Sequence, residues 1–386
     1  MIYVNWLNHV NGFGRRKLEA VCTIYGSGRE IWELGDRERK NKWRSHVQEK
    51  GKCALKERDL CLIEQFKSVV TPQKLWQDII NKGIRVIDTQ DSAYPARLLD
   101  IPDRPALLYM IGGNAYEPRE GAGQNRPTVA VVGSRVCSEY GRMIAGRIGR
   151  LCAMLGIELI SGMAVGIDGI AQRAALEAGG DSTAVLGSGV DICYPRENEE
   201  LYVNLKQKGR IISEYVPGML PKPGNFPLRN RIISGLADAL IVVEAKEKSG
   251  TMISVDMALE QGRDVYIIPG RLSDPLSVGC NRLISQGAEI IWNLTDTLEG
   301  IAGKKRQETL RGLAEEGQNA GPDPESPEAS VYSVLDFYPR TLQSIYEEAS
   351  KLSGVSFECV QTCLLELEMS GAVAQEGGRY FIRGKA

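Results

Sequence analysis

Short apolar runs alternate with longer amphipathic stretches between residues 128 and 293. The longer stretches predict helices between most of the runs, and the clearest of them are 139–155 and 167–178. The short runs predict β-strands at 128–132, 157–160, 183–186, 211–214, 240–243 and 265–268. Strands that alternate with helices are joined by right-handed crossovers, which place the strands in a parallel sheet. We therefore predict an α/β domain with a parallel sheet in residues 81–300.

The N-terminal segment, residues 1–80, is rich in charges and poor in β-branched runs, which predicts a helical domain of SAM-like type. Within it, residues 10–18 (VNGFGRRKL) resemble the turn of a helix-hairpin-helix motif. Such a turn either offers backbone N–H groups to a phosphate or forms a tight corner between two helices. Residues 81–115 predict an extended lead-in to the sheet, and residues 116–127 an exposed loop.

The C-terminal part divides into a linker and a small domain. Residues 301–329 lose apolar positions and gain proline, glycine and acids, which predicts a linker. Residues 330–386 predict a winged-helix domain, with three helical segments followed by a hairpin. Its last long helix, 357–369, holds three glutamates and no lysine or arginine, so the phosphates of duplex DNA would repel it. We therefore expect this domain to contact protein or to self-associate.

That last helix also has a face that we expect to be buried, formed by Val360, Cys363, Leu364 and Leu367. Arg379 and Arg383, on the predicted hairpin, are too few to reverse the negative sign of the helix.

Glycine-bearing loops follow five of the predicted strands. The loops after the strands of a parallel sheet gather at one edge, where ligands bind. Glycine lets the backbone approach a phosphate, and helix N-termini attract anions. The candidate binding residues in these loops are Gly133, Ser134, Arg135, Ser161, Gly162, Ser249 and Gly250, with further glycine loops at 187–189 and 269–271. Arg196 extends the basic rim beyond the loop at 187–189.

The segment FPLRNR carries the most specific local signal for a nucleic acid. Phe226 can stack on a base, and Arg229, Asn230 and Arg231 are expected to open a helix over 231–237. A ring, guanidinium groups and a helix N-terminus together suit a sugar-phosphate chain. We expect Arg135 and Arg229 to bind phosphate. One of the two arginines of the segment is expected to be structural, and Arg231 could pair with Glu214 or Glu244.

Two carboxylates near these loops admit more than one role. Asp168 could cap its own helix or orient the arginine loop beside it. Glu244 could be catalytic, although no partner base is evident in the sequence.

Composition narrows the choice of function. Lys+Arg 47 against Asp+Glu 49 gives a net charge of -2, so nucleic-acid binding must come from a local patch. The chain has two histidines, His9 and His46, and both lie far in sequence from the loops, which excludes a histidine base there. Neither GxGxxG spacing nor GxxxxGK[ST] occurs, so a dinucleotide oxidoreductase or P-loop ATPase is unsupported. We expect no cofactor.

The cysteines and the hydropathy pattern indicate a cytoplasmic location. The chain has nine cysteines and no CxxC pair, which is typical of reduced thiols, and we predict no metal site. No apolar run approaches the ~20 residues of a membrane span, and the N-terminus lacks the features of a signal peptide.

Taken together, these motifs resemble the DprA/Smf family of DNA-processing proteins. The resemblance covers roughly 200 residues in order, and the two ends of the chain resemble the SAM-like and winged-helix ends of that family. The matching motifs are Tyr94-Pro95, VVGSR, SGMAVGID, TAVLGSGVDICYP, IISE, FPLRNRII, VVEAKEKSG, ALEQGRDVYIIPG and VGCNRLISQGA. The chain departs from many members at Gln172, where they have histidine, and at Ser254-Val255, where they have Thr-Ala.

This resemblance implies an extended Rossmann-like domain that binds single-stranded DNA and is not an enzyme. It also implies a homodimer, loading of the RecA recombinase and a role in natural transformation. The residues carried over are Gly133, Ser134, Arg135, Ser161, Gly162, Phe226, Arg229, Asn230, Arg231, Ser249 and Gly250.

Two other functions remain open at the level of the sequence. A nucleotide-processing phosphoribohydrolase could share a related scaffold, but it would need a Pro-Gly-Gly-x-Gly-Thr-x-x-Glu loop, which residues 269–271 do not provide. A protein-interaction scaffold would leave Phe226 and the arginine loops without a purpose.

Overall fold

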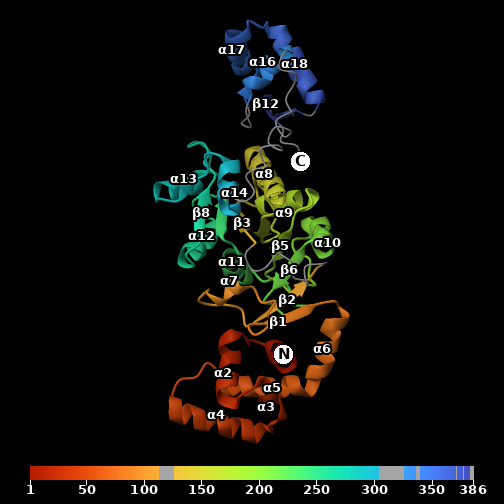
Figure 1. The fold of residues 1–386 in the computed structure, drawn as a ribbon, viewed down its shortest axis with the longest axis vertical. Helices are drawn as coiled ribbons and strands as arrows, with labels where there is room; N and C mark the ends of the chain where they lie inside the picture. Colours follow the sequence, from red (N-terminus) through yellow and green to blue (C-terminus); the bar gives the residue numbers. More distant parts are fainter. Residues whose placement is uncertain (113–125, 304–325, 336–339, 371, 377, 383–386) are drawn as a thin grey trace.

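The structure, a computed structural model, describes residues 1–112, 126–303, 326–335, 340–370, 372–376 and 378–382. At its centre lies a nine-stranded sheet with the strand order β1-β2-β6-β5-β4-β3-β7-β8-β9 (Figure 1). The strands are β1 (Arg85–Asp88), β2 (Leu107–Ile111), β3 (Thr128–Val132), β4 (Glu158–Ser161), β5 (Ser182–Val185), β6 (Arg210–Ser213), β7 (Ala239–Val242), β8 (Asp264–Ile267) and β9 (Glu289–Ile290). The seven neighbouring strands β6-β5-β4-β3-β7-β8-β9 all pair in parallel, which confirms the predicted α/β class.

One edge of the sheet differs from the prediction. Residues 81–115 were expected to be an extended lead-in, whereas they contribute β1 and β2, which pair antiparallel to each other. Strand β2 also pairs antiparallel to β6, so the complete sheet is mixed. The connection between β1 and β2 contains only the short helix α7 (Ala96–Leu99), and antiparallel strands need no long crossover.

Helices cover both faces of the sheet, because successive strand residues point to opposite sides. On one face, Val129 and Val131 of β3 pack against α8 (Glu139–Leu155), α9 (Ile167–Glu177) and α14 (Leu294–Ala302). On the other face, Ala130 and Val132 pack against α11 (Asn225–Leu236), α12 (Gly250–Glu260) and α13 (Val278–Ser285). A third cluster joins α10 (Glu199–Lys208) to the sheet near β5 and β6.

The N-terminal part is helical, as predicted. Its helices are α1 (Ile2–Asn8), α2 (Arg15–Tyr25), α3 (Gly28–Glu33), α4 (Asp36–Lys50), α5 (Glu57–Val69) and α6 (Pro72–Asn81). They enclose their own apolar core around Trp6, Tyr25 and Leu60. The Tyr109 hydroxyl of β2 donates to Asn5 Oδ1 at 2.9 Å, which ties this part to the sheet.

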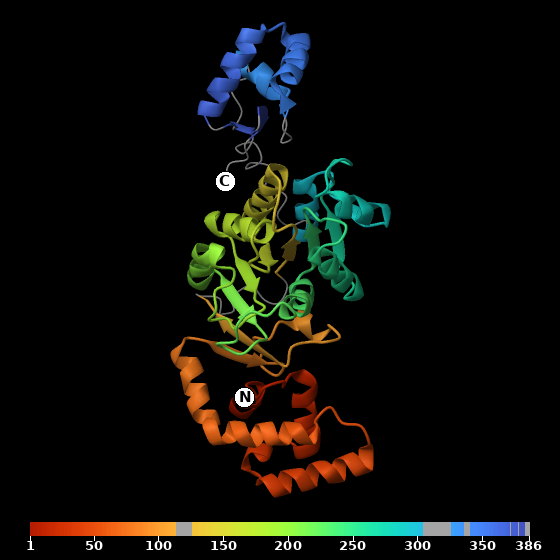
Figure 2. The same ribbon diagram turned by 180° about the vertical axis from the view of Figure 1, so that it is seen from behind.

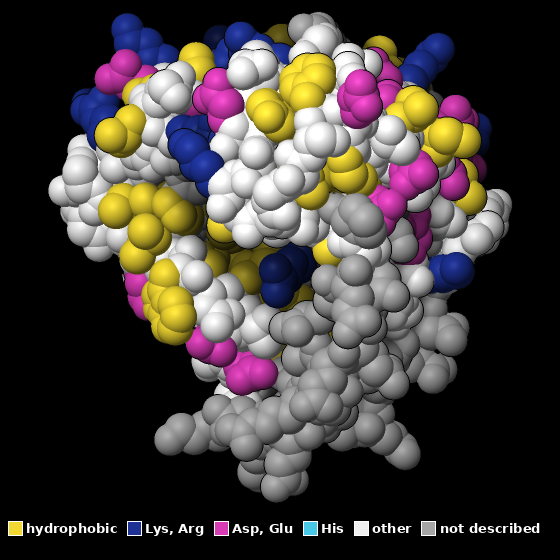
Figure 3. All heavy atoms as spheres, turned by 90° about the horizontal axis from the view of Figure 1, so that it is seen from above, with side chains coloured by type: hydrophobic (Ala, Val, Ile, Leu, Met, Phe, Trp, Pro, Cys, Tyr) yellow, Lys and Arg dark blue, Asp and Glu magenta, His cyan; other side chains and the backbone are white. Residues whose placement is uncertain are grey.

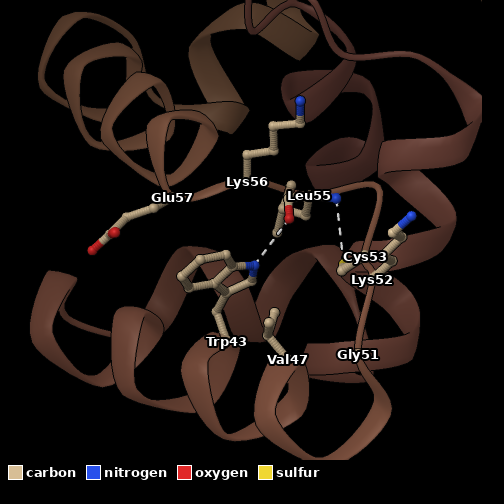
Figure 4. Close-up of a pocket in the computed structure, with 8 residues that line it drawn as sticks. All are labelled: Trp43, Val47, Gly51, Lys52, Cys53, Leu55, Lys56 and Glu57. Carbon is tan, nitrogen blue, oxygen red and sulfur yellow. Dashed lines mark hydrogen bonds between the residues drawn. The ribbon is translucent and has the colours of Figure 1, made fainter.

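A pocket of about 490 Å³ lies between α4 and α5 in this helical part (Figure 4). Its lining consists of Trp43, Val47, Gly51, Lys52, Cys53, Leu55, Lys56 and Glu57. The indole Nε1 of Trp43 donates to the Leu55 carbonyl at 3.0 Å and so closes one side of the pocket. Figure 1 places α4 and α5 at one end of the molecule, well away from the loops that follow the parallel strands.

The C-terminal part is a winged helix, as predicted. Its elements are α16 (Pro327–Ser333), β10 (Arg340–Thr341), α17 (Leu342–Ser353), α18 (Phe357–Met369), β11 (Val373–Glu376) and β12 (Arg379–Ile382), and its strands form a small sheet in the order β10-β12-β11. The predicted inner face of α18, from Val360 to Leu367, is buried in the core of this unit.

The predicted linker and loop fall largely outside the described residues. Helix α14 continues to Ala302 and α16 begins at Pro327, and the residues between 304 and 325 are not described. The same holds for most of the predicted loop at 116–127 and for Arg383. Within the described part of the chain, no helix is long and apolar enough to cross a bilayer.

Candidate nucleic-acid interface

The loops after β3, β4 and β5 converge on the first turn of α11. This helix begins at Asn225, six residues earlier than the sequence suggested, so Phe226 belongs to the helix. Pro227 lies in that first turn, where a proline costs no helical hydrogen bond. Its position in the sequence was therefore a sign that the helix begins before residue 231. The amide of Asn225 donates to the Gly187 carbonyl at 2.9 Å and fixes the helix start against the loop after β5.

Phe226 lies at the centre of a cluster of rings and guanidinium groups. The Arg135 guanidinium lies 5.9 Å from the centroid of the Phe226 ring, and that of Arg229 lies 6.0 Å from it. These are cation–π distances. The ring of Tyr194 lies 5.5 Å away, tilted by 30°. We call Arg135, Tyr194, Phe226 and Arg229 the ring cluster.

Tyr194 was not among the residues predicted for this cluster. Its side chain is 42% exposed, which is high for a large aromatic residue. The signal was present, because Tyr194 comes just before Arg196 in the same loop. An exposed ring beside an exposed arginine is the combination that binds a flexible nucleotide chain.

Two arginines of the interface are free to meet an anion. The guanidinium groups of Arg135 and Arg196 are exposed, and neither makes an ion pair or hydrogen bond with another described residue. Arg135 follows β3 directly, and Arg196 follows the loop after β5. Of these two arginines, Arg135 lies over the half-buried Phe226 ring, and Arg196 lies in the same loop as Tyr194, whose ring packs near Phe226.

Arg229 differs from the expectation that it binds phosphate. Its side chain is only 5% exposed, because it lies beneath Phe226 and inside the loops. Its Nη1 donates to the Gly162 carbonyl at 2.9 Å and to the Val185 carbonyl. Burial lowers the pKa of Arg229 to about 10, and Asp168 opposes that shift, so the group stays charged at neutral pH. Arg229 thus holds the loops after β4 and β5 in place.

Arg231 is also committed to a partner within the chain. Its guanidinium forms a double hydrogen bond with Glu214, at 2.7 and 2.6 Å, which identifies Glu214 rather than Glu244 as the partner. Both arginines of the segment are therefore structural in this conformation, where only one was expected to be. Asn230 between them is half-buried, and its carbonyl accepts from the Ser234 hydroxyl.

The loop after β4 is held from inside. The Ser161 hydroxyl donates to the Val131 carbonyl at 2.6 Å, and the Gly162 N–H donates to Asp168 Oδ2 at 3.1 Å. Asp168 therefore caps this loop rather than its own helix. Burial raises the pKa of the Asp168 carboxyl, and the nearby Arg229 charge opposes that rise. Neither predicted role is seen as stated, because Asp168 bonds the loop after β4 rather than capping α9 or bonding the arginine loop after β3.

Gln172, where many relatives of the resembled family have histidine, also supports this loop. Its Oε1 accepts from the Met163 N–H at 3.0 Å, and Met163 has a positive φ of 54°. Its amide donates to Ser182 and to the Thr183 carbonyl. The neutral side-chain amide of Gln172 therefore links the loop after β4 to strand β5 by hydrogen bonds.

The loops after β3 and β7 meet on the other side of the cluster. The Thr251 hydroxyl, in the first turn of α12, lies 3.4 Å from the Gly133 carbonyl and donates to it. This contact brings Ser249 and Gly250 beside the loop that carries Ser134. The Ser134 hydroxyl itself donates to the Val136 carbonyl at 2.5 Å.

Glu244 has a structural role, in contrast to the catalytic role that the sequence left open. It is 1% exposed and accepts from both the N–H and the hydroxyl of Ser138, at the start of α8. Burial raises the pKa of its carboxyl, and the Ser138 hydrogen bonds oppose that rise.

The loop at 269–271 is held by α13, because the Asn281 side chain bonds both the N–H and the carbonyl of Gly270.

Two of the three basic residues in the N-terminal hairpin turn are bound within the chain, and the third, Arg16, is exposed. Lys17 Nζ bonds Asp59 at 2.8 Å, and Arg15 bonds Glu19 at 2.7 Å and the Pro102 carbonyl at 2.9 Å. These contacts favour the alternative of a structural corner between α1 and α2.

Among the described residues, no group of three or more His, Cys, Asp and Glu side chains is arranged to hold a metal ion.

Comparisons with known families match the central sheet domain and the C-terminal part of this chain. Residues 85–302 match the family model described as DNA recombination-mediator protein A, and residues 315–379 match the DprA winged helix domain. The chain is 41% identical over 212 residues to the DNA processing protein DprA of Streptococcus pneumoniae, covering 54% of this chain and 71% of that protein. It is 36% identical over 307 residues to the protein Smf of Escherichia coli, covering 76% of each.

Two solved structures are similar to this fold. DNA processing protein A from Streptococcus pneumoniae superposes with a TM-score of 0.63 at 31% identity, over 77% of this chain and 97% of that one. DNA processing protein A from Helicobacter pylori superposes with a TM-score of 0.51 at 28% identity, over 56% of this chain and 95% of that one. The latter structure was determined to explain how that protein binds single-stranded DNA.

Proposed function

Because this chain belongs to the DNA recombination-mediator protein A family, as its motifs suggested, we propose that the ring cluster and its loops bind single-stranded DNA. The observation that carries the proposal is the position of Phe226, which is half-buried and lies near both the exposed Arg135 and the exposed ring of Tyr194. Aromatic rings stack on unpaired bases, and arginine neutralises the phosphates between them. The Helicobacter pylori relative, described as binding single-stranded DNA, supports the same function here.

The residues of the interface divide into two groups in this proposal. Arg135, Arg196, Tyr194 and Phe226 contact the nucleic acid, together with the backbone N–H groups around Gly133, Ser134, Ser249 and Gly250. Arg229, Arg231, Asn230, Ser161 and Gly162 hold those groups in position. A ring stacks on any base, so binding is expected to be independent of sequence and much weaker for duplex DNA.

The wider role follows the family. We propose that the protein acts on DNA taken up during natural transformation, as a homodimer that passes the bound strand to the RecA recombinase. It acts as a binding protein in the cytoplasm rather than as an enzyme. Light scattering of the purified protein tests the dimer, and capture of RecA in the presence and absence of single-stranded DNA tests the handover.

Filter binding with a labelled single-stranded oligonucleotide, run beside a nucleotide hydrolysis assay, tests the central proposal. Binding in the absence of hydrolysis supports it. Hydrolysis without binding would favour the phosphoribohydrolase alternative, and failure of both assays would favour a protein scaffold. The structure weighs against the hydrolase, since Glu244 is buried on Ser138 and the 269–271 loop is held by Asn281.

Gly187→Ala is expected to weaken single-strand binding about fivefold or more without unfolding the protein. A Cβ at this position would lie 2.9 Å from Cδ1 of Phe226, so the ring must shift from its place beside Arg135 and Tyr194. Gly224→Ala is the matched control, because a Cβ there meets nothing within 4 Å. Fluorescence anisotropy with a labelled oligonucleotide measures both. Equal affinities for the two variants would show that the ring position does not matter.

Removal of residues 304–386 is expected to leave single-strand affinity within about threefold, because the acidic α18 offers no attraction to phosphate. The cut keeps α14 intact, whose Ile301 and Ala302 pack against the core. Figure 3 looks onto the winged-helix end of the molecule, where acidic and basic side chains are interspersed and neither sign covers the face. A much larger loss, with circular dichroism showing a folded remainder, would show that the winged helix binds DNA.

A further inference from the structure

Asp191 lies where three segments around the ring cluster meet. It belongs to the loop after β5, which continues to Tyr194 and Arg196. Its Oδ1 accepts from the Gly218 N–H at 2.6 Å, and its Oδ2 accepts from Lys82 Nζ at 2.8 Å. Gly218 lies in the loop after β6, and Lys82 follows α6, which runs from the helical end of the molecule to the sheet (Figures 1 and 2). One carboxylate therefore joins two loops to the helical N-terminal part.

The two joined loops supply the two rings of the ring cluster. The loop after β5 carries Tyr194, and the loop after β6 leads into α11, whose second residue is Phe226. Beside the bond made by Asp191, the Gly189 N–H donates to the Met219 carbonyl at 2.9 Å. Gly189 has no room for a side chain, since a Cβ there would lie 2.8 Å from Oδ1 of Asp191. The two loops therefore form a close junction around this carboxylate, which we call the loop junction.

The charge of Asp191 cannot itself attract DNA, because a carboxylate repels phosphate. Its ion pair with Lys82 is weak, since the lysine side chain is 52% exposed. The bond to the Gly218 N–H has an ionised acceptor, and such bonds are stronger than bonds between neutral groups. Any contribution of Asp191 to DNA binding must therefore come from the positions of the two loops that it joins.

We propose that Asp191 is a positioning residue for the ring cluster, which it serves by holding the ring of Tyr194 beside that of Phe226. This inference rests on the proposed binding of single-stranded DNA at the ring cluster. The two rings lie 5.5 Å apart, and each comes from one of the two loops at the loop junction. When the junction opens, the rings separate, and a bound strand must order them again at a cost in affinity.

Two substitutions of Asp191 separate its hydrogen bond from its charge. Asp191→Ala removes a negative charge, yet it is expected to weaken single-strand binding about tenfold, because the loop junction opens. Asp191→Asn removes the same charge but keeps an oxygen that can accept from the Gly218 N–H, so its affinity should stay within about threefold of the wild type. Fluorescence anisotropy with a labelled mixed-sequence oligonucleotide measures both. Undiminished binding by Asp191→Ala, or an equal loss in both variants, would overturn the proposal.

Asp91→Ala is the matched control for Asp191→Ala. Asp91 Oδ1 accepts from the Ala93 N–H at 2.8 Å and from Arg85 Nη2 at 3.3 Å. Its side chain is 23% exposed, against 18% for Asp191. These bonds lie within the segment that runs from β1 towards α7, so they do not join the loops of the ring cluster. The affinity of this variant should change by less than about twofold, and a loss equal to that of Asp191→Ala would overturn the proposal.

A double-mutant cycle with Tyr194→Ala distinguishes positioning from a general loss of stability. If Asp191 acts through the ring of Tyr194, Asp191→Ala should cost less than about twofold in a protein that already carries Tyr194→Ala. The same tenfold factor in both backgrounds would overturn the proposal. If neither Tyr194→Ala nor Phe226→Ala weakened binding, the ring cluster would not be the DNA site, and the proposed function would fail together with this inference.

Hydrogen exchange measured without DNA tests the loop junction by itself. In Asp191→Ala, the Gly189 N–H that bonds the Met219 carbonyl should exchange about tenfold faster or more, while the N–H groups of α8 keep their rates. Mass spectrometry of peptides from residues 187–198 measures the change. Unchanged exchange in these peptides would overturn the proposal. Faster exchange with undiminished DNA affinity would overturn it as well, and would leave the proposed function of the ring cluster standing.

Discussion

Phe226→Ala is expected to weaken binding of single-stranded DNA by roughly 10- to 100-fold. Loss of one stacking ring costs ~1–3 kcal/mol, and about 1.4 kcal/mol corresponds to tenfold in affinity. The ring also carries Arg135 against its face, so its removal frees the one guanidinium that follows β3 directly. Fluorescence anisotropy with a mixed-sequence oligonucleotide measures the change.

Phe357→Ala is the matched control for that substitution. Phe357 is 38% exposed at the start of α18 and packs on Tyr346, so it is an exposed ring outside the interface. Its replacement should leave the affinity unchanged. If Phe226→Ala retained full affinity while remaining folded, stacking on Phe226 would be excluded, and binding would have to rest on the arginines alone.

Arg229→Met is expected to lower the free energy of unfolding by about 3 kcal/mol, because it leaves the buried Asp168 without its nearby positive charge. It also leaves the Gly162 and Val185 carbonyls without their donor. Urea denaturation followed by circular dichroism measures this loss. DNA affinity should fall as well, since the loops under Phe226 lose their support.

Arg135→Ala separates binding from stability. Its exposed side chain makes no hydrogen bond to other described residues, so unfolding should change by less than about 0.5 kcal/mol. Single-strand affinity should fall, and the slope of log affinity against log salt should change by about 0.7 for one lost phosphate contact. If Arg229→Met gave that slope change with full stability, Arg229 would contact phosphate directly, as the sequence first suggested.

The contrast between these two arginines shows where sequence analysis reaches its limit. The strands from β3 to β8 were placed within one residue, because buried parallel strands are apolar runs bounded by glycine. The early start of α11 was missed, and this start decides which way Arg229 points. Residues 226 and 229 are three apart, so in a helix they share one side, and Arg229 comes to lie beneath the ring.

Other parts of the site depended on contacts between distant segments. Tyr194 approaches Phe226 only because the loop after β5 and the start of α11 meet at the sheet edge. The pairing of Glu244 with Ser138 spans 106 residues, and no local pattern around either residue predicts it. The antiparallel strands β1 and β2 are short, and β2 joins the sheet by pairing with β6, far along the chain, so no local period marked them as part of the sheet.

The space above Gly162 has a consequence for protein engineering. A Cβ at this position would lie 2.5 Å from Nη1 of Arg229, so the missing side chain of one segment is filled by the arginine of another. Residues 162 and 229 must therefore be replaced together, although they are far apart in the chain. A chimera with a relative, joined at a point between residues 162 and 229, takes these two positions from different parents. It would fold well only if both parents have glycine at position 162, or if a smaller residue replaced Arg229.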